Sequence, residues 1–255
     1  MLLTIDIGNS HTVIGLFAAE DLLYNWRIQT NHRATADEIA ACLHGLFSMR
    51  GIHFTALTGM VIANVVPPLE ESWQNFARQL SLTPLMVTNR LDLGISVCTA
   101  EPSEVGADRL VNAVAGFHKF KQALIIVDFG TATTFDCISN QGEYLGGAIA
   151  PGLAISLEAL GARTARLPQV HLKPPEAAIG RDTVTAIQSG VMFGYSGLIE
   201  GLIKHLSAEF TSGPPLILAT GGIARLIAPL TPTIKHIEPL LTLEGLKLIH
   251  ERCAS

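Results

Sequence analysis

Two short segments of similar sequence contain the residues best suited to chemistry. The first segment reads Asp6-Ile7-Gly8-Asn9-Ser10-His11-Thr12, and the second reads Asp128-Phe129-Gly130-Thr131-Ala132-Thr133-Thr134. A glycine lets the backbone approach an anion closely, and backbone N–H groups with the hydroxyls of Ser10 and Thr12 can donate to phosphate oxygens. The carboxylate of Asp6 would repel a phosphate, but it can hold Mg²⁺ or its waters, which bridge to the phosphate. An ordinary Asp–Gly hairpin turn is the structural alternative for each segment.

The two segments also indicate an internal duplication. Each follows a short apolar run, at residues 2–5 and 124–127, and each precedes an expected second strand, at residues 12–17 and 133–139. Aspartate aligns with aspartate, glycine with glycine, and Thr12 with Thr134, at an offset close to half the chain. We therefore expect an α/β protein with two similar halves, residues 1–118 and 119–255, whose turns face each other across a nucleotide cleft.

The remaining hydrophobic pattern supplies the elements of two such halves. The spacing Thr35-x-x-Glu38 is typical of a capping box, and apolar residues follow it at helical intervals. Further helices are expected at residues 69–80, 110–118, 181–210 and 240–253, and further strands at residues 57–63, 85–87 and 216–219. The helix at 181–210 is apolar on most faces, so several neighbours must cover it, and a subunit interface would supply one.

Composition excludes several classes of protein. The net charge is −5 and no cluster of Lys and Arg is visible, which argues against nucleic-acid binding. The charge-free stretch at residues 183–199 is too short and too polar to span a membrane. The N-terminal apolar run lacks a basic flank and ends at Asp6, so we expect no secretory signal and a cytosolic protein. The four cysteines and nine histidines show no zinc spacing, so reduced thiols are expected.

Five motifs, taken together, resemble the type III pantothenate kinases, a family also named after a Bvg accessory factor. They are Asp6-Ile7-Gly8-Asn9-Ser10, Gly106-Ala107-Asp108-Arg109, Asp128-Phe129-Gly130-Thr131-Ala132-Thr133-Thr134, Gly146-Gly147-x-x-x-Pro151-Gly152 and Ile179-Gly180-Arg181-x-Thr183. The resemblance runs from residue 1 to about residue 225. It implies the fold of the acetate and sugar kinases, heat-shock chaperones and actin, with two ribonuclease-H-like halves around an ATP cleft. It also implies ATP-dependent phosphorylation of pantothenate to 4'-phosphopantothenate, the first step of coenzyme A biosynthesis.

The resemblance further implies a role for each matched position. ATP would lie on the first loop (residues 6–13) and on the second loop (residues 128–134), at Asp6, Ile7, Gly8, Asn9, Ser10, His11, Thr12, Val13 and Thr131. Pantothenate would lie on Gly106, Ala107, Asp108, Arg109 and Thr183, the last from the neighbouring subunit of a homodimer. Asp128 would bind a monovalent cation, K⁺ or ammonium, and Gly221 and Gly222 would lie on the adenosine side.

Asp108 is the candidate general base. A neutral alcohol is a poor nucleophile, and a carboxylate at hydrogen-bond distance can take its proton as the bond to phosphorus forms. Asp108 lies near the start of a predicted helix, where the helix dipole favours the ionised carboxylate; a helix-capping acid is the structural alternative. Arg109 can pair with the pantothenate carboxylate or with a surface acid.

Two other functions stay open, and one of them follows from a departure from the family pattern. Thr99 stands where members often carry a tyrosine, seven residues before the glycine of the Gly106–Arg109 motif, so this part of the substrate site is roomier or filled differently. A kinase of another small alcohol therefore remains possible. A non-catalytic, nucleotide-binding transcriptional regulator is the second alternative, although a regulator need not keep Asp6, Asp108 and Asp128 together.

Overall fold

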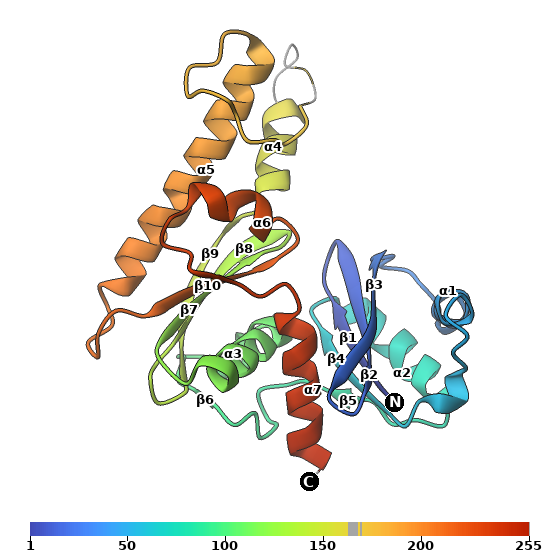
Figure 1. Cartoon of the computed structure of the whole chain (residues 1–255). Coiled ribbons are helices and arrows are strands. Elements are labelled where there is room, and N and C mark those ends of the chain that lie inside the picture. The colour runs from blue at the N-terminus through green and yellow to red at the C-terminus, as the bar shows by residue number, and fades with distance from the viewer. Residues whose placement is uncertain (163–167, 169, 255) are drawn as a thin grey trace. The chain divides into compact units, whose positions relative to one another are not determined.

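The computed structural model describes residues 1–162, 168 and 170–254 (Figure 1). The chain forms two compact units, the first made of Met1–His118 with Leu241–Ser255 and the second of Lys119–Leu240. The division falls after His118, where the sequence analysis joined the two halves. Each unit is built around its own mixed sheet and its own core.

The first unit holds a five-stranded sheet in the order β3-β2-β1-β4-β5. Its strands are β1 (Leu2–Ile7), β2 (His11–Ala18), β3 (Asp21–Gln29), β4 (Gly59–Asn64) and β5 (Leu85–Met86). The first three strands form an antiparallel meander, and β4 and β5 continue the sheet in parallel from β1. Apolar residues of β1 and β2 pack against helices α1 (Ala36–Ser48) and α2 (Glu70–Gln79).

The second unit repeats this arrangement. Its strands β7 (Leu124–Phe129), β8 (Ala132–Ile138), β9 (Glu143–Pro151), β10 (Leu216–Gly221) and β11 (His236–Ile237) pair in the order β11-β10-β7-β8-β9. The first three are antiparallel, and β10 and β11 are parallel to β7. The duplicated, ribonuclease-H-like α/β halves expected from the sequence are thereby confirmed.

The two halves differ by one residue at their first turn. In the first unit Ile7 pairs with Thr12, whereas in the second Phe129 pairs with Thr133. Residues 8–11 form the first turn and residues 130–132 the second, so the second is one residue shorter. The expected match of Thr12 with Thr134 is therefore wrong, because the strand after the shorter turn starts one residue earlier and brings Thr133 to the equivalent place.

Helices complete both units. The remaining elements are β6 (Ser96–Val97), α3 (Ala107–Phe120), α4 (Leu153–Ala162), α5 (Thr183–Ser207), α6 (Ala224–Ile227) and α7 (Leu241–Ala254). The predicted capping box of α1 is confirmed, because Thr35 Oγ1 accepts from the Glu38 N–H at 3.3 Å and Glu38 Oε2 accepts from the Thr35 N–H at 2.8 Å. The apolar middle of α5 packs on β7 and β8 in the core of the second unit.

The last helix corrects the expected domain boundary. The sequence analysis placed all residues after 118 in the second half, but α7 lies against β1, β2 and β4 of the first unit. Its periodic apolar residues predict burial without showing which sheet they will cover. Within the part of the chain that the structure describes, no helix is both long and apolar enough to cross a membrane.

Candidate functional site

The first loop forms a tight turn between β1 and β2. The Gly8 N–H donates to the His11 carbonyl at 3.1 Å, and a Cβ at position 8 would lie 3.0 Å from the same oxygen. Ile7 is fully buried in the core, whereas Asn9, Ser10 and His11 are exposed at the tip. A ligand can therefore reach the tip of this loop, while its base is fixed in the sheet.

Two residues that follow β3 support the turn from below. The Thr30 hydroxyl donates to the Gly8 carbonyl at 2.7 Å, and the Thr30 N–H donates to the Ser10 carbonyl at 3.0 Å. His32 Nε2 lies 2.8 Å from the Asn9 carbonyl oxygen, which can only accept, so this nitrogen carries the proton. Three successive carbonyl oxygens, which would repel a phosphate, are thus engaged within the protein.

The Thr12 hydroxyl takes part in the same support. Thr12 is 2% exposed, and its Oγ1 lies 3.0 Å from Thr30 Oγ1. The sequence analysis offered this hydroxyl as a phosphate donor, but here it bonds to another side chain. Thr30 and His32 were missed by the sequence analysis, which predicted no strand at residues 21–29 and so had no signal for the residues that follow β3.

The second loop repeats this design with a different partner. The Gly130 N–H donates to the Ala132 carbonyl at 3.1 Å, and Thr131 is exposed beside it. Thr133, fully buried, forms a hydrogen bond with the hydroxyl of Tyr195 on α5. Burial raises the pKa of Tyr195, so its phenol stays protonated. In both units, the threonine that follows the turn is buried and bonded to a second hydroxyl.

Two backbone segments lie close against the second loop. A Cβ at Gly152, just before α4, would lie 2.2 Å from the Thr131 carbonyl oxygen. Gly221 adopts φ +92°, and a Cβ there would lie 2.6 Å from Asp128 Oδ1. The end of β10 and the start of α4 therefore meet the second loop, which explains both glycines. Half-buried Asp128 lies at the end of β7, next to the Gly221 backbone.

Asp108 lies in the first turn of α3. Its Oδ1 accepts a hydrogen bond from the Arg109 N–H at 2.8 Å, and a Cβ at Gly106 would lie 2.6 Å from this oxygen. Glycine at position 106 therefore leaves room for the carboxylate. Burial raises the pKa of Asp108 above its ordinary value, and the Arg109 N–H opposes this shift. A carboxylate that holds its proton more tightly is a better proton acceptor while it remains ionised.

The first unit brings Asp6 and Asp108 to the same region. Val65, directly after β4, donates its N–H to the Ile7 carbonyl at 3.1 Å. The Val65 Cγ1 lies 3.6 Å from the position of a Cβ at Gly106. The carboxyl ends of the parallel strands β1 and β4 therefore meet the start of α3, which is where ligands commonly bind in open α/β sheets.

Thr183 lies apart from the other predicted residues of its own unit. It is the exposed first residue of α5, where Asp182 Oδ1 caps the helix by accepting from the Thr185 N–H at 2.8 Å. Tyr195, which contacts the second loop, follows twelve residues later, or about 18 Å along the helix at about 1.5 Å per residue. The start of α5 lies beside α4, away from the sheet (Figure 1).

In the described part of the chain, single carboxylates are the candidates for binding metal ions. Among residues 1–162, 168 and 170–254, no three His, Cys, Asp or Glu side chains come together as a metal site. Mg²⁺ at nucleotides is held by one or two carboxylates together with phosphates and waters, so Asp6 alone fits such an ion. Asp128 Oδ1 and the Phe129 carbonyl oxygen would each lie 2.6 Å from a Cβ at Gly221, so two oxygen donors lie near this position.

Comparisons with known proteins agree on one family. A family model described as type III pantothenate kinase matches residues 2–205. Proteins of that name from Geobacter sp. (strain M21) and Pelobacter propionicus are 46% and 47% identical over 253 residues, covering 99% of this chain and 99% of each relative. The likeness therefore extends over the whole length of both relatives.

Solved structures share the fold at lower identity. A Campylobacter jejuni protein assigned to a Baf family of transcriptional activators superposes with a TM-score of 0.61 at 21% identity, covering 98% of both chains. The activator of 2-hydroxyisocaproyl-CoA dehydratase from Clostridium difficile, with bound ADPNP, gives a TM-score of 0.56 at 13% identity, covering 98% of this chain and 94% of the other. These likenesses concern the fold alone.

Thr30 provides a test of the first loop. We expect Thr30→Val to weaken binding of a non-hydrolysable ATP analogue about tenfold, because the Gly8 carbonyl and the Thr12 hydroxyl each lose a partner. Isothermal titration calorimetry measures the affinity, and circular dichroism checks the fold. Thr83→Val, at an exposed threonine of the same unit, is the matched control and should bind normally. Equal affinities for the two variants would show that the Thr30 support does not matter to a ligand.

Proposed function

Because the chain belongs to the type III pantothenate kinase family, we propose that it transfers the γ-phosphoryl group of ATP to the primary hydroxyl of pantothenate. The products are 4'-phosphopantothenate and ADP, and the reaction opens coenzyme A biosynthesis. The full-length identity to relatives of that name is the observation that carries the proposal. We propose a cytosolic enzyme, since ATP, its phosphoryl donor, is abundant there.

The two loops are proposed to hold the phosphates of ATP. The first loop would contact them through its exposed tip, Asn9 to His11, and the second through Thr131. Thr12 would act through the shape of the turn, since its hydroxyl is bonded to Thr30. Phosphoryl transfer depends mostly on positioning and on neutralising charge, so a turn fixed at three carbonyls suits the task.

Asp6 and Asp128 are proposed as the ion-binding residues. Mg²⁺ on Asp6, directly or through water, would neutralise charge on the β- and γ-phosphate oxygens. Asp128 would bind K⁺ or ammonium beside the second loop. Support for this role is its half-buried carboxylate against the Gly221 backbone, where a non-glycine side chain would collide with it.

Asp108 is proposed as the general base. As the pantothenate oxygen bonds to the γ-phosphorus, its proton passes to the Asp108 carboxylate, and the bond to the bridging oxygen of ADP breaks. Gly106 leaves room at this carboxylate, and the start of α3 favours its ionised form. Arg109, in the same helical turn, would pair with the carboxylate of pantothenate, with Gly106 and Ala107 lining the site.

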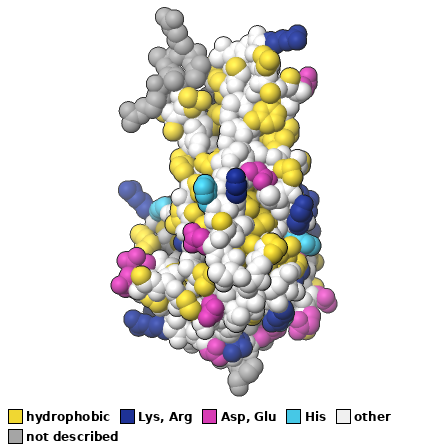
Figure 2. Space-filling model, turned by 90° about the vertical axis from the view of Figure 1, so that its left-hand side faces the viewer, with side chains coloured by type: hydrophobic (Ala, Val, Ile, Leu, Met, Phe, Trp, Pro, Cys, Tyr) yellow, Lys and Arg dark blue, Asp and Glu magenta, His cyan; other side chains and the backbone are white. Residues whose placement is uncertain are grey.

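A homodimer is proposed through α5 and its neighbour α4. Large hydrophobic side chains are exposed along these helices, including Ile155 on α4 and Val184, Phe193 and Leu198 on α5. Figure 2 shows hydrophobic side chains over this part of the second unit. A second subunit would cover them, and it would bring the exposed Thr183 to the partner's pantothenate site.

The first test is a coupled assay of ADP formation with Mg-ATP and pantothenate in K⁺ and in Na⁺ buffers. We expect activity that depends on pantothenate and on K⁺. Asp128→Asn should lose the stimulation by K⁺, because one carboxylate ligand of the cation is gone. Equal rates in both buffers would support the kinase activity and contradict the role of Asp128 in binding a cation. A folded protein without activity in either buffer would favour another alcohol substrate or a nucleotide-binding regulator.

Asp108 is tested by its pH dependence. Because only the ionised carboxylate accepts a proton and burial raises its pKa, kcat/KM for pantothenate should fall on acidification, starting at a higher pH than an ordinary aspartate would give. Asp108→Asn should lower kcat by about 10²–10⁴-fold and abolish the fall of kcat/KM on acidification. Calorimetry should show that this variant still binds an ATP analogue. Glu71→Gln, at an exposed acid of α2, is the control. Unchanged turnover in Asp108→Asn would exclude Asp108 as the general base.

The dimer is tested by its apolar surface. Phe193, 40% exposed on α5, should pack at the interface, so Phe193→Glu should give a monomer by light scattering coupled to gel filtration. The monomer should also bind pantothenate more weakly, because Thr183 of the partner is removed. Lys204→Glu introduces the same charge at an exposed site of the same helix and should remain dimeric. A Phe193→Glu protein that elutes as the parent does would contradict this interface.

A further inference from the structure

The last helix, α7, makes two specific contacts with the helix that carries Asp108. It lies beyond residues 2–205, which the family model matches, and it returns to the first unit after the second unit is complete. Both contacts fall on the turn of α3 that follows Asp108. Residues three and four positions after a helical residue lie on the same side of the helix as that residue.

The first contact joins two backbones. A Cβ at Gly245 of α7 would lie 2.3 Å from the Val111 carbonyl oxygen and 2.7 Å from Val111 Cγ1. Val111 is three residues after Asp108 and fully buried. Only glycine permits this approach. The distance between the two helices at this position is therefore set by their main chains, and no flexible side chain lies between them.

The second contact is a hydrogen bond beside the first. The Thr242 hydroxyl donates to Asn112 Oδ1 at 2.8 Å, and Asn112 is fully buried four residues after Asp108. A hydrogen bond has a preferred direction as well as a length. Together with the Gly245 contact it therefore restricts both the rotation of α3 and its position along its axis.

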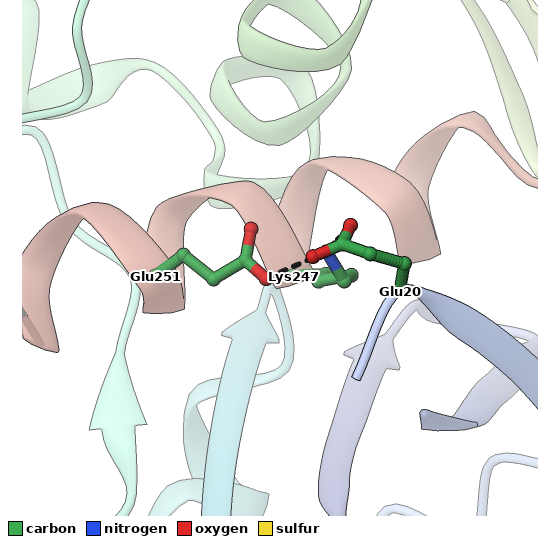
Figure 3. A network of polar contacts seen from close by, with 3 residues as sticks. All are labelled: Glu20, Lys247 and Glu251. Atoms are coloured by element: carbon green, nitrogen blue, oxygen red, sulfur yellow. Dashed lines mark hydrogen bonds and ion pairs between the residues drawn. The ribbon is translucent and has the colours of Figure 1, made fainter. Parts of the chain in front are cut away.

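The sheet of the first unit holds α7 in place. The Lys247 ammonium lies 2.6 Å from Glu20 Oε2, in the turn between β2 and β3, and 2.6 Å from Glu251 Oε1 (Figure 3). The Lys247 side chain is 7% exposed, whereas that of Glu20 is 84% exposed, so the buried lysine reaches its carboxylate partner at the surface. Leu243 packs at Gly15 of β2, where a Cβ would come within 3.1 Å of its Cδ1. Because α7 contacts both the strands and α3, the position of α3 depends on the position of the strands.

We propose that α7 is a positioning element for Asp108. In it, Gly245 and Thr242 fix the axial position and the rotation of α3, and thereby the position of the Asp108 carboxylate that proton transfer requires. The inference rests on the proposed function of Asp108 as base and extends it to residues far along the chain. A helix that merely covered the sheet would need apolar contacts such as that of Leu243. It would need neither a backbone contact with α3 nor a bond to a buried asparagine.

A double-mutant cycle tests this role. We expect Thr242→Val, which keeps the shape of the side chain and removes its hydrogen bond, to lower kcat roughly tenfold with KM for ATP unchanged. In the Asp108→Asn background the same change should have no further effect on kcat, because the residue it positions is gone. A purely structural role would lower the rate by the same factor in both backgrounds.

Controls separate the possible outcomes. Arg252→Gln removes the exposed ion pair with Asp92 at the far end of α7 and should leave kcat unchanged. Gly245→Ala adds a methyl group against Val111 and should lower kcat as Thr242→Val does. If Gly245→Ala fails to fold, the double-mutant cycle with Thr242→Val still tests the positioning role. An Asp108→Asn variant with parental kcat would overturn the base and this inference together. A large loss in Asp108→Asn with none in Thr242→Val would overturn the positioning role alone.

Discussion

A hydrogen bond between two hydroxyl groups at the base of each loop is the interaction on which both units depend. Thr12 and Thr133 occupy equivalent, buried places, and neither hydroxyl can reach water there. A buried hydroxyl without a partner costs free energy, so each threonine requires a hydrogen-bond partner, and in both units this partner is a second hydroxyl. In the first unit Thr30 supplies it from the end of β3, and in the second unit Tyr195 supplies it from α5. The duplicated loops are thus supported by different elements in the two units, the end of β3 in the first and α5 in the second.

Close contacts of glycine backbones with neighbouring groups set the second constraint. Gly106, Gly152 and Gly221 each lie where a Cβ would collide with Asp108, Thr131 or Asp128. At each position a main chain lies against a group that the proposed reaction uses. Gly152 and Gly221 also meet backbone atoms of Thr131 and Phe129, and these distances vary little because no side-chain rotamer can adjust them. The second loop can therefore keep a fixed shape although its tip is exposed.

The sequence predicted the local and repeated features of this protein well. The aspartate–glycine turns, the capping box at Thr35 and the two similar halves follow from residue types and spacing over short stretches, which the sequence displays directly. The shorter second turn was missed because strand pairing, and not spacing along the chain, decides that Thr133 replaces Thr134. Thr30 and Tyr195 were missed for a related reason, since a hydroxyl reveals no partner until the strands and helices meet. The return of α7 could not be inferred either, because an apolar helix face does not show which sheet it covers.

The position of α7 has a consequence for how the chain folds. The second unit is one continuous segment, Lys119–Leu240, whereas the first unit needs Leu241 and the residues after it. During synthesis the middle of the chain can therefore complete its contacts while the N-terminal sheet still lacks a cover. Closing the first unit joins residues more than two hundred positions apart, such as Glu20 and Lys247, and contacts of that separation form late because of their loop-closure entropy. The half that leaves the ribosome first would thus be the last to mature, and until then its apolar strands would be open to chaperones or to aggregation.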